Sequence, residues 1–157
     1  MDVLKLSTDY LEGEVVMKIA VIGSRSLTVV DLAQYLPIGV TEIVSGGARG
    51  VDTSAREYAH AHGLSCVEFL PDYAKYGRSA PLRRNLQIIE YADMVLAFWD
   101  GKSRGTAYVI RKCREMNVPC KVFMRKKRMR QRGLNCLLHR GYWRKLRVDH
   151  SPHANNR

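Results

Sequence analysis

Three short segments of the sequence combine glycine, hydroxyl-bearing and arginine residues, a composition suited to holding phosphate. They are Gly23-Ser24-Arg25, Ser45-Gly46-Gly47-Ala48-Arg49-Gly50 with the following Val51-Asp52, and Ser103-Arg104-Gly105-Thr106. Glycine lets a backbone approach a ligand closely, and unpaired N–H groups at the start of a helix bind anions. Each segment follows a short apolar run that is typical of a buried strand. A phosphate-binding site is therefore the first chemistry that these residues indicate.

Other readings of the same residues remain open. The glycines of the second segment also suit tight turns and close packing. Asp52 suits two roles equally, as the cap of a following helix or as a partner for ribose hydroxyls. Arg84 and Asn85 belong to the first turn of a predicted helix that enters a strand, a position that favours a binding role for Arg84 over a solvated one.

Two well-known nucleotide motifs are absent. The first turn has one glycine, so the dinucleotide fingerprint GxGxxG is not present. Gly101-Lys102-Ser103 resembles the end of a P-loop, but Leu96 occupies the position of the earlier glycine that this motif needs. Neither the usual NAD binding nor P-loop ATP hydrolysis is supported. We therefore assign no cofactor, no metal and no catalytic residue from the sequence.

The elements that must position these segments follow from the hydrophobic pattern. Five apolar runs predict strands, at residues 19–22, 43–44, 66–70, 94–99 and 120–123. Helical spacing of apolar residues predicts helices between them, at 29–36, 51–62, 82–89 and 107–113. This alternation indicates an α/β fold, a Rossmann-like doubly wound parallel five-stranded sheet with helices on both faces. The expected strand order is 3-2-1-4-5, which brings the three segments to one edge.

Composition places the chain among ordinary globular proteins. Of its 157 residues, 46% are hydrophobic and 26% are charged. No apolar run reaches the length of a membrane span, so we expect no membrane association. Residues 1–16 lack the pattern of a signal peptide. The four cysteines form no CxxC pair, which favours reduced thiols and a cytoplasmic location.

The net charge of +11 is concentrated at the C-terminal end. Residues 125–157 hold eleven Lys or Arg against one acid, a net of +10, whereas residues 17–124 carry a net of only +4. We therefore expect three parts: an N-terminal extension (1–16), a nucleotide-binding domain (17–124) and a basic C-terminal tail (125–157) that is disordered. Such a tail would bind nucleic acid weakly and in a salt-sensitive way, the alternative being a passive solvated extension.

Taken together, the site segments resemble the SLOG superfamily, named for the DNA-processing protein DprA/Smf and the lonely-guy phosphoribohydrolases. The likeness covers about residues 18–124 and is nearest to the small YspA/YpsA-like proteins of bacteria and phages. It is carried by the run from Ser45 to Asp52, by Arg84-Asn85, and by Ser103-Arg104-Gly105-Thr106-Ala107. The resemblance implies binding or sensing of a nucleotide or nucleotide-derived ligand.

Two further functions are implied by other members of the superfamily. Lonely-guy enzymes release a base from a nucleoside monophosphate, using an arginine similar in position to Arg84 and a glutamate that falls on Val109. Valine can neither accept a proton nor bond ribose, which disfavours that reaction, although Asp52 or Asp100 could substitute. DprA binds single-stranded DNA, and this activity is the other alternative. The sequence leaves open whether the chain forms a homo-oligomer.

Overall fold

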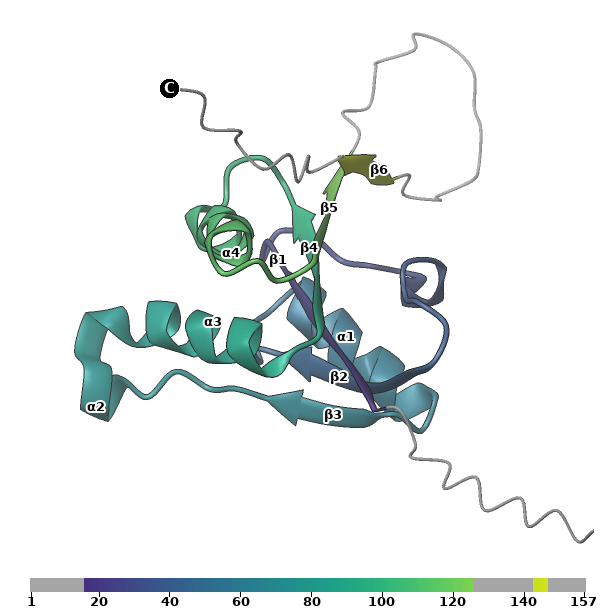
Figure 1. Ribbon diagram of the computed structural model, residues 1–157, viewed down its shortest axis with the longest axis horizontal. Helices are drawn as coiled ribbons and strands as arrows, with labels where there is room; N and C mark the ends of the chain where they lie inside the picture. Colours follow the sequence, from purple (N-terminus) through teal and green to yellow (C-terminus); the bar gives the residue numbers. More distant parts are fainter. Residues whose placement is uncertain (1–15, 126–142, 147–157) are drawn as a thin grey trace, which may run out of the picture.

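The computed structural model describes residues 16–125 and 143–146, which form one layered α/β domain (Figure 1). Its sheet contains β1 (Met17–Gly23), β2 (Val40–Ser45), β3 (Ser65–Glu68), β4 (Met94–Trp99), β5 (Cys120–Arg125) and β6 (Trp143–Leu146). The strand order is β3-β2-β1-β4-β5-β6. Strands β1 to β5 are all parallel, in the predicted order 3-2-1-4-5. The predicted Rossmann-like fold is confirmed.

Strand β6 pairs antiparallel with β5 at the edge of the sheet. It belongs to the basic C-terminal segment, and the sequence prediction did not include it. The rest of that segment, and with it the expected contact with nucleic acid, lies outside the described residues.

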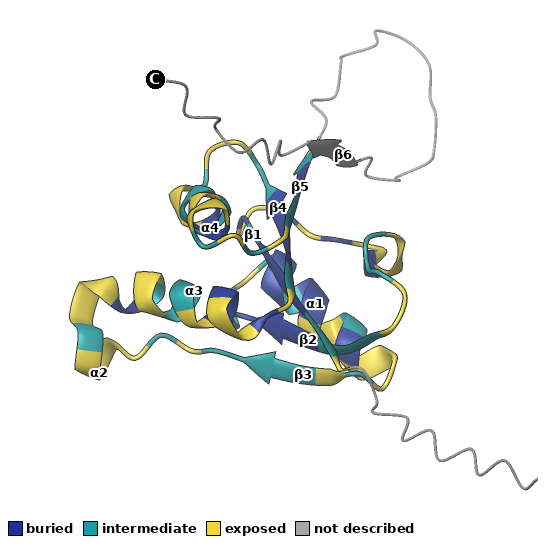
Figure 2. Ribbon diagram, viewed as in Figure 1, coloured by how far each residue is buried: buried dark blue, intermediate teal, exposed yellow. Residues whose placement is uncertain are grey.

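Helices cover both faces of the sheet. They are α1 (Val51–Ala61), α2 (Tyr73–Tyr76), α3 (Ala80–Tyr91) and α4 (Arg104–Glu115), with short 3-10 turns η1 (Leu32–Gln34) and η2 (Gly77–Ser79). Helix α1 packs on one face, where it shares a core cluster with alternate residues of β1, β2 and β4. Helices α3 and α4 pack on the other face with the remaining residues of those strands. Figure 2 shows the central strands as the most buried part.

Helical spacing explains three of the four predicted helices. In α1, Val51, Ala55 and Ala59 are all fully buried and recur every fourth residue, so that they form one stripe against the sheet. In α4, Val109 and Cys113 are buried and four residues apart, so they form a similar stripe against the sheet. These helices and α3 confirm the predictions for 51–62, 82–89 and 107–113.

The predicted helix at residues 29–36 is wrong. Only the turn η1 is helical there, and the rest of the β1–β2 connection is irregular. Its apolar residues are buried individually, because Leu27, Val29 and Leu32 all reach the cluster under α1, while Val30 is 88% exposed. The N–H of Val29 donates to Ser54 Oγ on α1 (3.2 Å), so tertiary contacts replace helical hydrogen bonds.

A glycine at the start of α1 ties this irregular connection to the helix. Gly50 is the N-cap residue with φ of 84°, and a Cβ there would lie 2.7 Å from the carbonyl oxygens of Arg25 and Leu27. Gly39 has a similar φ of 85°, but a Cβ there would meet nothing within 4 Å.

We predict that Gly50→Ala lowers the free energy of unfolding by about 2 kcal/mol more than Gly39→Ala. Both variants place a side chain at a positive φ, a strained backbone conformation that costs about 1–3 kcal/mol, but only Gly50→Ala adds overpacking, which costs about 1–3 kcal/mol. Equilibrium urea denaturation of the two variants measures the difference. Equal losses would show that the start of α1 is not packed against the β1–β2 connection.

Candidate functional site

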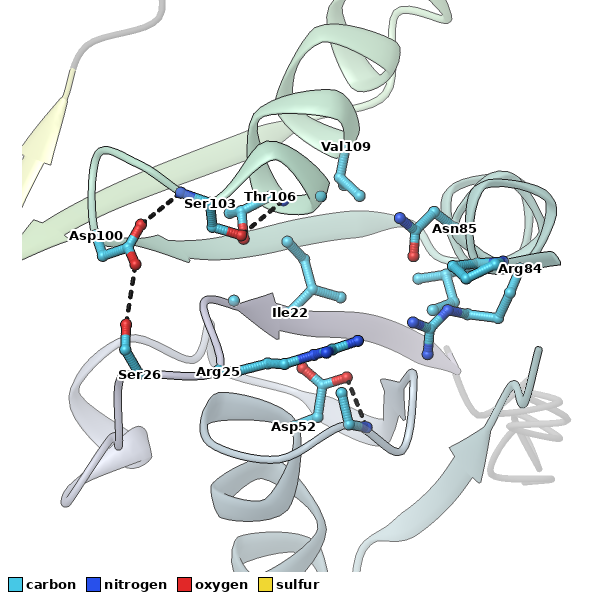
Figure 3. Close-up of a pocket in the computed structure, with 15 residues that line it drawn as sticks. Ile22, Arg25, Ser26, Asp52, Arg84, Asn85, Asp100, Ser103, Thr106 and Val109 are labelled. Carbon is cyan, nitrogen blue, oxygen red and sulfur yellow. Dashed lines mark hydrogen bonds between the residues drawn. The ribbon is translucent and has the colours of Figure 1, made fainter. Parts of the chain in front are cut away.

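A cavity of about 400 Å³ lies at the carboxyl edge of the sheet, where β1 and β4 end side by side (Figure 3). Strand order reverses between these two strands, and ligands of open α/β sheets bind at such a point. The lining residues come from the ends of β1 and β4, from the segment before α1 and its first turn, and from the first turns of α3 and α4. They are Ile22, Gly23, Arg25, Ser26, Ala48, Asp52, Pro81, Arg84, Asn85, Ile88, Asp100, Ser103, Gly105, Thr106 and Val109.

Three helices, α1, α3 and α4, begin at this cavity. Each contributes residues of its first turns to the lining: Asp52 from α1, Pro81 from α3, and Gly105 with Thr106 from α4. The first N–H groups of a helix have no partner within it, and the helix dipole places partial positive charge there. This applies to α1 and α4 but not to α3, where the N–H of Ala80 donates to the carbonyl of Gly77 and Pro81 has no N–H. The starts of α1 and α4 therefore make the cavity favourable for an anion.

The buried carboxylate of Asp52 holds the segment between β2 and α1 in place. Its Oδ2 accepts hydrogen bonds from the N–H groups of Gly46 (3.1 Å) and Ala48 (3.2 Å). Burial raises the pKa of Asp52, while the N–H donors of Ala48, Gly46 and Gly23 and the charge of Arg84 lower it. Asp52 is therefore not the cap of α1, because Gly50 occupies that position.

A second carboxylate, Asp100, fixes the loop between β4 and α4. Its Oδ1 accepts from the N–H groups of Lys102 (2.9 Å) and Ser103 (2.7 Å), and its Oδ2 accepts from Ser26 Oγ (2.9 Å). The N–H of Asp100 donates to Ser24 Oγ (3.1 Å). Partial burial raises the pKa of Asp100, but these N–H and hydroxyl donors outweigh it and lower the pKa to about 2. Asp100 thus links the ends of β1 and β4.

The start of α4 is held by its own cap. Ser103 is the N-cap residue, and its Oγ accepts from both the N–H (3.4 Å) and the hydroxyl (3.1 Å) of Thr106. Thr106 is buried, whereas Arg104 and Gly105 are exposed. The first turn of α4 is therefore fixed by its cap, and Gly105 and Thr106 from this turn line the cavity.

Two arginines differ in how they are held. Arg84 Nη1 donates to the carbonyl oxygens of Gly46 and Phe69. Burial lowers the pKa of Arg84 and the charge of Arg25 adds to this, while Asp52 opposes it. Arg25 makes no hydrogen bond or ion pair with any residue that the structure describes, and Figure 3 shows its side chain reaching across the cavity toward Asp52. Arg25 is the cation available to a ligand.

The remaining wall of the cavity is apolar. Ile22 and Ile88 are buried, Val109 is buried on α4, and Pro81 begins α3. Asn85 projects into the cavity from α3 beside these groups (Figure 3). The cavity wall is therefore polar near the starts of α1 and α4, and it is apolar where Ile22, Ile88 and Val109 line it.

The structure brings together nine of the fifteen residues that the sequence singled out. Those lining the cavity are Gly23, Arg25, Ala48, Asp52, Arg84, Asn85, Ser103, Gly105 and Thr106.

The other six, Ser24, Ser45, Gly46, Gly47, Arg49 and Gly50, do not line it. Ser24 and Ser45 are buried and bond neighbouring loops. Gly46 leaves room for Arg84, because a Cβ there would overlap its guanidinium. Gly47 packs against Leu70, Gly50 caps α1, and Arg49 is exposed.

Sequence reasoning missed part of the lining. Ser26, Ile22, Pro81 and Ile88 were not selected, and Asp100 was considered only as a substitute acid. The signal for Asp100 was present, since an aspartate follows the most apolar strand and precedes a glycine. The apolar lining residues carried no such signal in the sequence, because residues of the hydrophobic core show the same pattern.

Two comparisons with known proteins bear on the family of this chain. The model of the family described as "YspA, cpYpsA-related SLOG family" matches residues 17–76, from β1 to the end of α2. The "Gene 61 protein" of Mycobacterium phage D29 is 32% identical over 89 residues, covering 53% of this chain and 70% of that protein. The chain belongs to the YspA/cpYpsA-related SLOG family.

Membership of this SLOG family suggests nucleotide-related binding or processing. The family match includes Arg25 and Asp52 but ends before Arg84, Asn85 and the start of α4, so it covers six of the fifteen residues that line the cavity. No solved structure matches the chain. Within the described residues, no helix is long and apolar enough to cross a membrane.

We predict that the native state loses stability as the pH falls from about 4 to 2 and that Asp100→Asn removes much of this dependence. The pKa of Asp100 is about 2 in the folded protein and about 3.9 in an unfolded chain. Its ionised form therefore stabilises the fold above pH 4, and this contribution disappears as protonation proceeds. Urea denaturation midpoints of the wild type and of Asp100→Asn between pH 5 and 2.5 measure this loss of stability. Parallel curves for the two proteins would contradict this role of Asp100.

Proposed function

We propose that this protein binds a nucleotide or a nucleotide-derived ligand in the cavity between the ends of β1 and β4. The observation that carries the proposal is the convergence of the N-termini of α1 and α4 and of two arginines on one cavity with an apolar wall. The phosphate would lie at the start of α4, within reach of Arg25. The sugar and base would extend toward α3.

The charges around the cavity favour an anionic group. Arg84 is partly buried, and its charge is stabilised by Asp52 and opposed by Arg25, so an anion between the two guanidinium groups would give both a further favourable partner. The carboxylates of Asp52 and Asp100 bond backbone N–H groups, and neither forms a hydrogen bond or ion pair with Arg25 in the described part of the chain. Hydrogen bonds to charged groups are worth about 1.5–3 kcal/mol each.

The apolar wall favours a ligand larger than inorganic phosphate. A volume of about 400 Å³ is in the range of small-molecule sites, which typically pair apolar walls with a few polar groups. Ile22, Ile88 and Val109 would contribute nothing to a bare phosphate. They would cover one face of a planar base, and the ligand would gain from the apolar area that it buries.

The site supports binding or sensing better than hydrolysis. Val109 lines the cavity where the lonely-guy resemblance places a glutamate. The two carboxylates that line the cavity, Asp52 and Asp100, accept backbone N–H bonds that hold the loops. Neither is free to transfer a proton without loosening its loop. The free thiols of Cys66, Cys113 and Cys120 support a reducing, cytoplasmic setting.

We predict that Arg25→Ala weakens nucleotide binding at least tenfold, since a charged hydrogen bond contributes about 1.5–3 kcal/mol and 1.4 kcal/mol is tenfold. Arg49→Ala is the matched control, because Arg49 is also an exposed loop arginine but does not line the cavity. Thermal shift against mononucleotides, ADP-ribose, NAD and cyclic nucleotides selects the ligand, and isothermal titration calorimetry gives the affinities.

Equal losses of nucleotide affinity in Arg25→Ala and Arg49→Ala would place the binding site elsewhere. Chromatography of the titrated samples separates binding from hydrolysis. Steady release of free base by the wild-type protein, abolished in Arg84→Ala, would replace the sensing role with the enzymatic one.

A further inference from the structure

Arg84, near the start of α3, uses only part of its hydrogen-bonding capacity. Its Nη1 donates to the carbonyl oxygens of Gly46 and Phe69. Its Nε is buried and has no partner among the residues that the structure describes, and its Nη2 donates to none of them. Donors that stay unpaired in a partly buried site cost free energy. Because Arg84 lines the cavity, an anionic ligand group at its guanidinium would offset this cost.

The side chains at this end of the cavity carry an excess of positive charge. Arg25 and Arg84 both line the cavity, and Figure 3 shows their guanidinium groups pointing toward one another near Asp52. The charges of Asp52 and Arg84 are close enough to influence each other. The other carboxylate that lines the cavity, Asp100, is engaged in the loop between β4 and α4. Two cations therefore face one carboxylate here, which favours a further anion.

This end of the cavity lies apart from the start of α4. The carbonyl groups that hold Arg84 directly follow β2 and β3, whereas α4 begins after β4. In the strand order β3-β2-β1-β4, these positions are two to three strands apart, which corresponds to about 9–15 Å along the edge of the sheet. Figure 3 shows Ile22 between Thr106 and Arg84. A single phosphate, whose oxygens accept hydrogen bonds over about 3 Å, cannot contact both places.

We infer that the ligand carries two separated anionic groups, one bound at the start of α4 and the other by Arg84. The ligand class is a nucleotide phosphorylated on both sides of its sugar, such as a nucleoside 3′,5′-bisphosphate. Arg25 follows β1, between the two places, and serves both groups. The apolar side chains of Ile22, Ile88 and Val109 suit the uncharged sugar and base. This inference rests on the proposed function, because it adds a second anionic group to the same ligand.

The test compares ligands that differ in the second phosphate. Calorimetric titration of the full-length wild-type protein with AMP, ADP and adenosine 3′,5′-bisphosphate, and with the three corresponding guanosine compounds, gives the affinities. Within a series, we expect the bisphosphate to bind roughly tenfold or more tightly than the monophosphate, since it gains charged hydrogen bonds at Arg84. The diphosphate should gain clearly less, because its two phosphates are joined directly and cannot reach both places.

Two variants then assign the second anionic group to Arg84. Arg84→Met removes the charge and keeps an unbranched side chain, so the preference for the bisphosphate over the monophosphate should nearly disappear. The readout is the ratio of the two affinities in one protein, which cancels any general effect on the loop that Arg84 holds. Arg83→Met is the matched control, because Arg83 is an exposed arginine on the same helix and outside the cavity lining. Its affinity ratio should equal that of the wild type.

The outcomes separate this inference from the function on which it rests. Equal binding of the bisphosphate and the monophosphate by the wild type would overturn the inference while leaving nucleotide binding intact, and this comparison does not depend on the folding of any variant. Equal gains for the diphosphate and the bisphosphate, or equal losses of the preference in Arg84→Met and Arg83→Met, would also overturn it, since total charge would then explain the affinities. Failure of both series to bind the wild type would instead overturn the proposed function.

Discussion

The cavity depends on one buried carboxylate. Asp52 accepts hydrogen bonds from the N–H groups of Gly46 and Ala48, and Gly23 also contributes a backbone donor. These donors belong to the ends of β1 and β2, so a single side chain at the start of α1 fixes two loops relative to one helix. Burial raises the pKa of this carboxylate, which shows that desolvation opposes its charge. The N–H bonds and Arg84 offset that cost and keep the loops in place.

Asp100 performs the same task on the other side of the cavity. It joins the loop after β4 to Ser26 in the loop after β1. The polar groups of the site thus divide into two classes. Asp52, Asp100, Ser103 and Thr106 bond one another or the backbone and build the cavity, whereas the side chains of Arg25 and Asn85 have no hydrogen-bond partner among the described residues. Such pre-organisation reduces the ordering cost of binding.

The sequence predicted the fold and the strand ends well, because buried parallel strands and amphipathic helices leave strong hydrophobic patterns. It misjudged residues 29–36, where Leu27, Val29 and Leu32 are buried by tertiary contacts that no local period reveals. Within the site, it could mark glycine-rich segments but could not separate residues that face the cavity, such as Arg25, from those that support it, such as Gly46. That division depends on side-chain direction, which only the packed loops determine. The role of Asp52 was undecidable for the same reason.

We propose that the ends of β1 and β4 and the first turns of α1, α3 and α4 form a nucleotide site. The most direct measurement is a titration of ¹⁵N-labelled protein with AMP, followed by backbone amide chemical shifts in two-dimensional NMR spectra. We predict that the amides of Arg25, Ala48, Asn85, Gly105 and Thr106 shift together in a saturable way. The amides of Gly39 and Gly63, which are not among the residues that line the cavity, should not move. Saturable shifts confined to residues outside the cavity, or no shifts at millimolar AMP and other nucleotides, would contradict the proposed nucleotide site.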